Sequence, residues 1–154
     1  MIGSDTSVTA PVGRPNHKDV EMRFMLLQNY GQVESGCSPM PEWSPEDIKA
    51  HIAFQQAMNE ELTESGELVD AQGLAGPDQA KYVVSDGVTA PVITDGPYSE
   101  SKELLAGFRM IDVESLDRAL EIAAKASAAP GPGGVALRDP IEVRQIMGAP
   151  DPEV

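Results

Sequence analysis

The spacing of apolar positions along the chain predicts four main strands. A short apolar run at residues 23–27 indicates a buried strand, because runs of this length between polar segments are typical of strands. Residues 107–113 and 141–147 have the same character, and Leu68 with Val69 begins a further strand. Together these segments supply the strands of a sheet.

A first helix is expected between the first two strands. Ser44 is suited to cap it, Pro45 suits the first helical position, and Asp47 lies three residues after the cap. The helix is expected to end near Gly66. Four apolar residues recur at about 100° per residue and predict its buried side. They are Ile48, Ile52, Met58 and Leu62.

A second helix is expected from about Ser115 to Ser127, and the proline- and glycine-rich residues 130–134 end it. Apolar residues three and four positions apart predict its buried face. They are Leu116, Ala119, Leu120 and Ala123.

A β-hairpin is predicted before the third main strand. Residues 81–85 and 91–94 flank Asp86-Gly87, a pair whose chemistry suits a tight turn. The predicted order is therefore β-α-β-(hairpin)-β-α-β, an α+β chain with the ferredoxin-like arrangement. Its helices cover only one sheet face, and a sheet from a second subunit is a natural cover for the other.

Length and charge narrow the class of protein. The 154 residues suit one domain, expected at 21–147, with a flexible extension at 1–20 and a loose tail at 148–154. The net charge of −14 disfavours nucleic acid and anionic membrane as partners. The single cysteine, Cys37, fits a reducing compartment, and no apolar run is long enough for a bilayer. We therefore expect a cytoplasmic protein.

Residues 95–103 read D-G-P-Y-S-E-S-K-E. This segment resembles the pattern D-G-P-[FY]-x-E-[ST]-K-E of the DGPF subgroup of the YCII-related family, and the likeness extends over roughly residues 21–147. The resemblance implies a homodimeric α+β barrel in which two ferredoxin-like sheets face each other. It also implies a cleft near each DGPF loop, with a small organic molecule as the expected partner.

Two residues are candidates for acid/base chemistry. His51 lies beside the apolar stripe of the first helix, and its ring titrates near neutral pH. The resemblance also implies a histidine near the start of this helix. Asp95 is placed to orient His51 as the second member of a dyad. The structural alternatives are a packed helix histidine with one hydrogen bond and an aspartate that caps its own turn.

Five further residues are candidates for substrate binding. Tyr98 and Phe108 are suited to the apolar wall of a cleft, and either is equally suited to a core. Lys102 and Glu103 form the polar part of the signature, with a surface ion pair as the alternative. Arg109 stands where an aromatic residue is common in the resembled family, and its fork geometry suits a carboxylate or a salt bridge.

No cofactor is expected. His17, His51 and Cys37 do not make a metal cluster, and the glycines of residues 130–134 do not follow a strand, as a dinucleotide loop requires. An enzyme of this kind is a cofactor-independent lyase or isomerase that performs elimination, isomerisation or cyclisation. The alternative is a non-catalytic module that binds a ligand or a protein and accompanies a transcriptional regulator. Residues 130–140 look like an insertion whose role the sequence leaves open.

Overall fold

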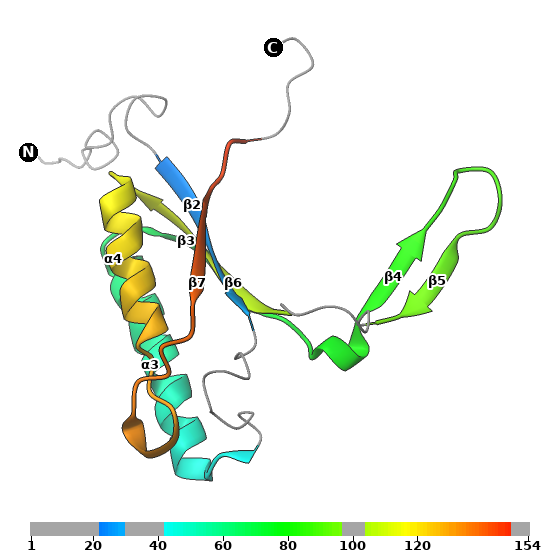
Figure 1. Cartoon of the computed structure of the whole chain (residues 1–154). Helices are drawn as coiled ribbons and strands as arrows, with labels where there is room; N and C mark the ends of the chain where they lie inside the picture. The colour runs from blue at the N-terminus through cyan, green and yellow to red at the C-terminus, as the bar shows by residue number, and fades with distance from the viewer. Residues whose placement is uncertain (1–21, 30–41, 97–103, 149–154) are drawn as a thin grey trace, which may run out of the picture.

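Four strands form an antiparallel sheet, and two helices cover one of its faces (Figure 1). The computed structural model describes residues 22–29, 42–96 and 104–148. The strands of this sheet are β2 (Met22–Asn29), β3 (Leu68–Gly73), β6 (Leu105–Val113) and β7 (Ile141–Gln145), and the helices are α3 (Pro45–Glu64) and α4 (Leu116–Ser127). The strand order β3-β6-β2-β7 places the first and third main strands in the centre. The predicted ferredoxin-like α+β fold is confirmed.

Both helices begin at a serine cap, as the sequence predicts for the first of them. The Ser44 hydroxyl accepts a hydrogen bond of 3.1 Å from the Asp47 amide, and Pro45 occupies the first turn. Ser115 caps α4 in the same way. Gly66, with φ +79°, follows the end of α3 and takes a conformation that favours glycine. Neither helix is long and apolar enough to cross a membrane.

The helix faces that pack on the sheet agree with the predicted ones only in part. Ile52, Leu116 and Leu120 are each nearly half exposed, so their assignment to the buried faces is wrong. The buried positions are His51, Met58 and Leu62 on α3, and Ala119, Ile122, Ala123 and Ala126 on α4. Three alanines on α4 let this helix approach the sheet closely, which turns the larger leucines outward.

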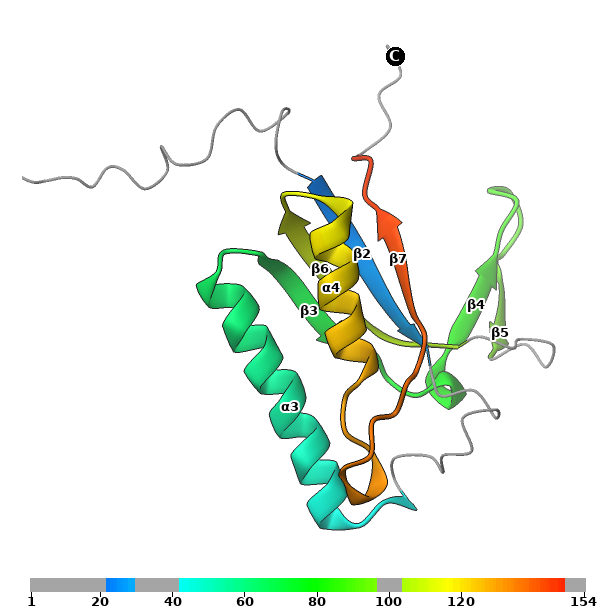
Figure 2. The same ribbon diagram turned by 60° about the vertical axis from the view of Figure 1, so that its left-hand side comes forward.

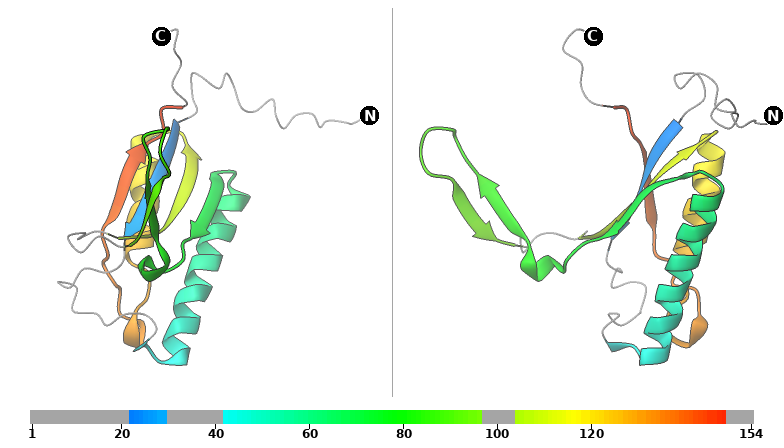
Figure 3. Two further views of the ribbon diagram at one scale, coloured as in Figure 1. Left: turned by 90° about the vertical axis from the view of Figure 1, so that its right-hand side faces the viewer. Right: turned by 180° about the vertical axis from the view of Figure 1, so that it is seen from behind.

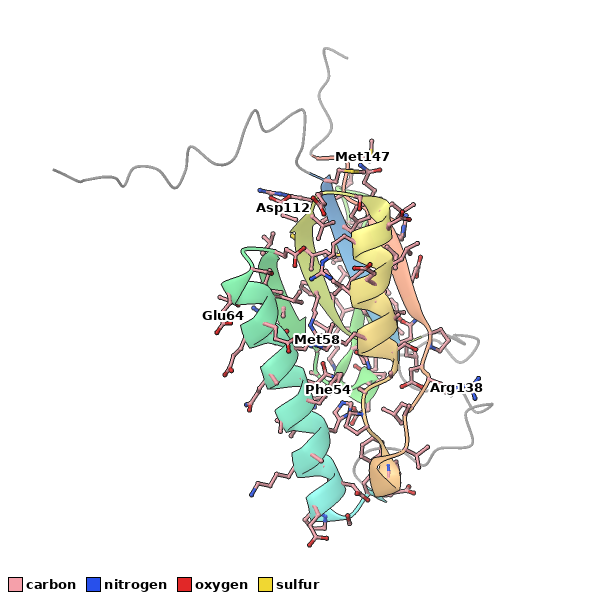
Figure 4. All side chains as sticks on the ribbon, turned by 90° about the vertical axis from the view of Figure 1, so that its left-hand side faces the viewer. Phe54, Met58, Glu64, Asp112, Arg138 and Met147 are labelled. Atoms are coloured by element: carbon pink, nitrogen blue, oxygen red, sulfur yellow. The ribbon has the colours of Figure 1, made fainter. Side chains whose placement is uncertain are left out.

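The hydrophobic core fills the space between the helices and the sheet at the C-terminal half of α3. Figure 4 shows Phe54 and Met58 on the side of α3 that faces α4 and the sheet, whereas Glu64 lies on the outer side. Met58 and Ile111 are the largest side chains that are completely enclosed. The other core members are Phe24, Leu26, Leu62, Val113, Ala119, Ile122, Ala123 and Ala126.

A hairpin of strands β4 (Lys81–Val84) and β5 (Val92–Asp95) extends away from the sheet on the side opposite the helices (Figures 1 and 3). The hairpin itself is confirmed. The predicted tight turn at Asp86-Gly87 is wrong, because Val84 pairs with Val92 and a seven-residue loop joins the strands. Within that loop the Asp86 carboxylate accepts the amides of the residues two and three positions later, which lowers its pKa.

A bidentate ion pair ties the sheet to α4. Arg118 donates from Nε and Nη2 to the two carboxylate oxygens of Glu67, at 2.9 and 2.8 Å. Glu67 immediately precedes β3, and its backbone oxygen also accepts the Asp112 amide of β6. The Arg118 hydrogen bonds lower the pKa of Glu67 below its ordinary value. This contact therefore joins an edge strand, a central strand and a helix.

The Glu67 pair predicts a pH-dependent contribution to stability. Since the folded-state pKa is lowered, the contribution is present above the ordinary pKa of the carboxyl group and is lost as the pH falls through the folded value. Glu67→Gln should lower the free energy of unfolding by about 1 kcal/mol at pH 7, discounted for the partial exposure of Arg118. Glu121→Gln, which removes the exposed second partner, should cost less than about half of that. Urea denaturation at pH 7 and pH 3 measures both, and equal losses for the two variants contradict the assignment.

Candidate functional site

A cavity of about 340 Å³ is lined by residues from the middle of α3 and from the sheet, and it borders the hydrophobic core. Figure 2 shows that α3 and α4 both lie over the sheet. Its apolar wall includes Leu26, Ala126 and Ile141, which come from β2, α4 and the start of β7. Its polar residues include His51, Gln55, Asn59 and Arg109. A small cavity with an apolar wall and a few convergent polar groups is typical of a binding site for a small molecule.

Two glycines opposite each other leave room for the cavity. Gly73 of β3 and Gly107 of β6 are paired in register, two positions from the pair of Ala71 and Arg109 and on the same face of the sheet. Neither glycine places a side chain on the helix side of the sheet. A Cβ atom at Gly107 would lie 2.8 Å from the Gln72 carbonyl oxygen, so glycine also allows the two strands to approach closely there.

Polar side chains from α3 and β6 make one hydrogen-bonded network at this cavity. His51, Gln55 and Asn59 are four residues apart and therefore follow one stripe of α3. Arg109 reaches this stripe from β6. Its Nε donates to Asn59 Oδ1 at 2.7 Å, and its Nη2 donates to Gln55 Oε1 at 2.5 Å.

The network defines the tautomer of His51. The Pro130 carbonyl can only accept, so the 3.0 Å contact to His51 Nδ1 places the ring proton on Nδ1. Arg109 can only donate, so the Gln55 amide turns its oxygen to Arg109 and its nitrogen to His51. Gln55 Nε2 then donates to His51 Nε2 at 3.3 Å. His51 is therefore a neutral imidazole with no proton on Nε2, and this residue lines the cavity.

The chain segment after α4 builds the other side of the histidine. It folds back through hydrogen bonds from Leu137 to Ala129 and from Arg138 to Ser127, and it meets the start of α3 where Gly133 donates to Asp47. Pro130, the partner of His51 Nδ1, belongs to this segment. The apparent insertion at residues 130–140 is therefore structural support for the site.

Asp139 is a buried acid close to His51. It is 8% exposed, and burial raises its pKa above the ordinary value, while the positive charge of a protonated His51 opposes that rise. The preceding residue, Arg138, has φ +61°, a conformation that costs an L-residue about 1 kcal/mol. The left-handed turn lies directly before the buried carboxyl group. Strained backbone and a perturbed acid together are typical of functional positions.

The ring of His51 has one aromatic neighbour as well. Trp43 meets it edge to face, with ring centroids 5.6 Å apart and an interplanar angle of 82°. His51 itself is only 8% exposed. The imidazole is therefore held by an indole, a carbonyl and an amide, which restricts its motion.

The structure does not bring Asp95 to His51 within one chain. Asp95 ends β5, its side chain is 80% exposed, and its carboxylate pairs with Lys81 at 2.5 Å. The predicted contact between the two residues is therefore absent, because the aspartate closes the base of the hairpin. Phe108 borders the cavity, but its alternation with Arg109 along β6 directs its side chain to the other sheet face. Tyr98, Lys102 and Glu103 lie outside the described residues.

Sequence reasoning missed three members of the site. Gln55 and Asn59 continue from His51 at a spacing of four residues, and this polar stripe beside the apolar one was a signal for a hydrated or reactive helix face. Asp139 gave no such signal, since its burial depends on how the segment after α4 folds back. Arg109 was a candidate, and the structure places it in the cavity wall. No group of three or more metal-ligating side chains occurs within the described ranges.

The chain is similar to a known domain family and to a protein of known sequence. The family model of the YCII-related domain matches residues 22–143, which include both helices, the residues that line the cavity and all of the sheet except the last two residues of β7. An uncharacterized protein of Rhizobium meliloti (strain 1021), R00369, is 33% identical over 97 residues. That alignment covers 62% of this chain and 77% of the relative.

The pKa of Asp139 is raised whereas that of Glu67 is lowered, so we expect Asp139 to affect stability in the opposite direction as the pH changes. Its folded-state pKa is raised, so the folded state binds the proton more tightly, and stability is lost as the pH rises through the folded pKa. Asp139→Asn should therefore unfold at higher urea concentration than the wild type at pH 7, and this gain should shrink toward pH 4. Glu60→Gln removes the same charge from an exposed part of α3 and should change stability by less than about 0.5 kcal/mol. A less stable Asp139→Asn variant at pH 7 contradicts this role.

Proposed function

The chain belongs to the YCII-related domain family, and from this premise we propose that it is a homodimer whose cavity binds a small organic molecule and exchanges a proton with it. The observation that carries the proposal is the position of His51. Its ring is enclosed, is held in one tautomer, and borders a cavity that also contains a guanidinium group. A neutral imidazole with one unprotonated ring nitrogen is a general base suited to neutral pH.

The surroundings of His51 support proton transfer at Nε2. The hydrogen bond from Gln55 to this nitrogen is 3.3 Å long and therefore weak, so little binding energy is lost when a ligand displaces the amide. Once the ring has taken a proton, Nδ1 still donates to Pro130. The buried Asp139 lies close enough for its charge to stabilise the imidazolium. We assign Asp139 this supporting role, and Asp95 is not needed for it.

Removal of a proton from carbon begins the reactions expected of such a site. Elimination, isomerisation and cyclisation each start when a base takes a proton from a carbon next to a carbonyl or a leaving group. The guanidinium lies against the apolar wall of the cavity, and a surrounding of low polarity strengthens its electrostatic contribution. The proposed reaction class is therefore that of a cofactor-independent lyase or isomerase.

Uncovered apolar surface supports a homodimer. Strand alternation puts four half-buried residues, Met25, Leu27, Phe108 and Met110, on the sheet face away from the helices. The hairpin extends from this same side, and its two strands carry four aliphatic side chains that are more than 60% exposed (Figure 3). They are Val83, Val84, Val92 and Ile93. An isolated two-stranded hairpin has little stability in water, and a second copy supplies a cover for both surfaces.

Proton exchange in D₂O tests the chemistry without knowledge of the product. The panel is 2-oxo acids, 3-oxo esters and unsaturated lactones, and proton NMR measures deuterium uptake at carbon. We expect faster exchange than in buffer for at least one compound, and a loss of about 10²-fold or more in His51→Asn. Asp95→Asn, which changes the exposed hairpin base, should retain the wild-type rate.

Two results overturn the proton-transfer proposal. Undiminished exchange in a folded His51→Asn variant removes this residue from the chemistry. If the wild type accelerates exchange of no compound in the panel, the non-catalytic ligand-binding alternative replaces the enzyme.

Light scattering tests the homodimer. The wild type should show twice the 16.4 kDa mass of one chain. Met110→Lys places a charge on the open sheet face and should produce a monomer, because an unpaired charge at the centre of an interface costs several kcal/mol. The control Leu120→Lys changes an exposed position on the outer side of α4 and should remain a dimer. A monomeric wild type at micromolar concentration rules out the homodimer.

A further inference from the structure

Arg109 is a buried cation without an acidic partner among the described residues. It is 7% exposed. Its Nε donates to Asn59 Oδ1, and its Nη2 donates to Gln55 Oε1 and, at 3.4 Å, to the Gln55 backbone oxygen. All three acceptors are uncharged. Within residues 22–29, 42–96 and 104–148, no hydrogen bond uses the two N–H groups of Nη1.

Burial of this charge is costly. Burial lowers the pKa of the Arg109 guanidinium, but its ordinary value is so high that the group stays charged at neutral pH. The side-chain amides of Gln55 and Asn59 fix the orientation of the guanidinium and accept hydrogen bonds from two of its nitrogens, but they do not balance its charge. A buried charge held only by dipoles therefore destabilises the folded protein. An anion that enters the cavity recovers part of this cost.

The cavity around Arg109 fits a small organic anion. Leu26, Ala126 and Ile141 line it with apolar surface, and the paired Gly73 and Gly107 leave space beside the guanidinium. The free volume of about 340 Å³ is larger than a simple inorganic ion requires. The lining therefore provides for a charged head and an apolar body in one molecule.

The charge of the site selects among anions. Arg109 is the one basic side chain other than His51 among the described residues that line the cavity, and His51 is neutral in the observed network. One guanidinium balances one negative charge, and the chain as a whole carries −14. A phosphate dianion is poorly compensated here, whereas a carboxylate carries a single negative charge and can accept hydrogen bonds from the unused Nη1 group of Arg109.

We infer that the ligand is a small organic monocarboxylate, with its carboxylate on Arg109 and its apolar body against Leu26, Ala126 and Ile141. This inference rests on the proposed small-molecule cavity and names its ligand class. It also directs the chemistry, because the carboxylate anchors the molecule on the same network that holds His51. The carbon that loses its proton to Nε2 then belongs to the body of the ligand.

Matched acids and amides test the carboxylate class directly. The probes are butyrate, cyclohexanecarboxylate and benzoate, each compared with its primary amide by isothermal titration calorimetry. The full-length wild type should bind at least one acid at least tenfold more tightly than its amide. Arg109→Met should abolish that preference, and Arg109→Lys, which keeps the charge and loses the fork, should show an intermediate one. The control Lys49→Met removes a positive charge from an exposed position on α3 and should bind as the wild type does.

The wild-type measurement stands even if a variant fails to fold. Three wild-type results overturn the inference. They are equal affinity for acid and amide, no binding of any acid up to roughly 10 mM, and tighter binding of inorganic phosphate than of every acid. A preference for acids that survives in folded Arg109→Met overturns it as well. Selective, Arg109-dependent binding without proton exchange retains the ligand class and rejects the catalytic proposal. If neutral compounds exchange a proton and acids are not preferred, the catalytic proposal is retained and the monocarboxylate ligand class is rejected.

Discussion

The arrangement of the site depends on the buried guanidinium of Arg109. A charge at this depth needs acceptors in defined positions, and Gln55 and Asn59 of α3 supply them. Once Gln55 turns its oxygen to Arg109, its nitrogen must face His51, and the ring must keep its own proton on the side of Pro130. One buried charge thus sets the orientation of an amide, the tautomer of a histidine and the approach of the segment after α4.

Two stripes of α3 serve different purposes. One stripe buries Met58 and Leu62 against the sheet, in the hydrophobic core. The other is the polar stripe from His51 through Gln55 to Asn59, which lies over a part of the sheet that ends in glycines and alanines. Because the core supplies stability, the polar stripe can hold an incompletely balanced charge beside a buried acid. Such groups reduce stability and are retained where they contribute to function.

The face of the sheet away from the helices presents a different physical problem. Its central residues are apolar, and the hairpin beside it exposes aliphatic side chains on both of its faces. The helices of one chain cannot reach this side (Figure 1). A symmetric pair of chains buries both surfaces with the same contact made twice, and it leaves the cavity on the helix side accessible. The proposed assembly and the proposed site therefore do not compete for the same surface.

The sequence by itself determined the local elements of this protein. Apolar spacing, the serine cap of α3 and the glycine after it are local signals, and they predicted the main strands, both helices and the order that leads to the ferredoxin-like fold. The tertiary structure decided which helix residues are buried, because the close approach of the alanines of α4 turned its leucines outward. It also decided which acid lies near His51. Asp95 lies on an exposed hairpin, whereas Asp139 comes close to the ring only when the segment after α4 folds back, a long-range arrangement that no local pattern encodes.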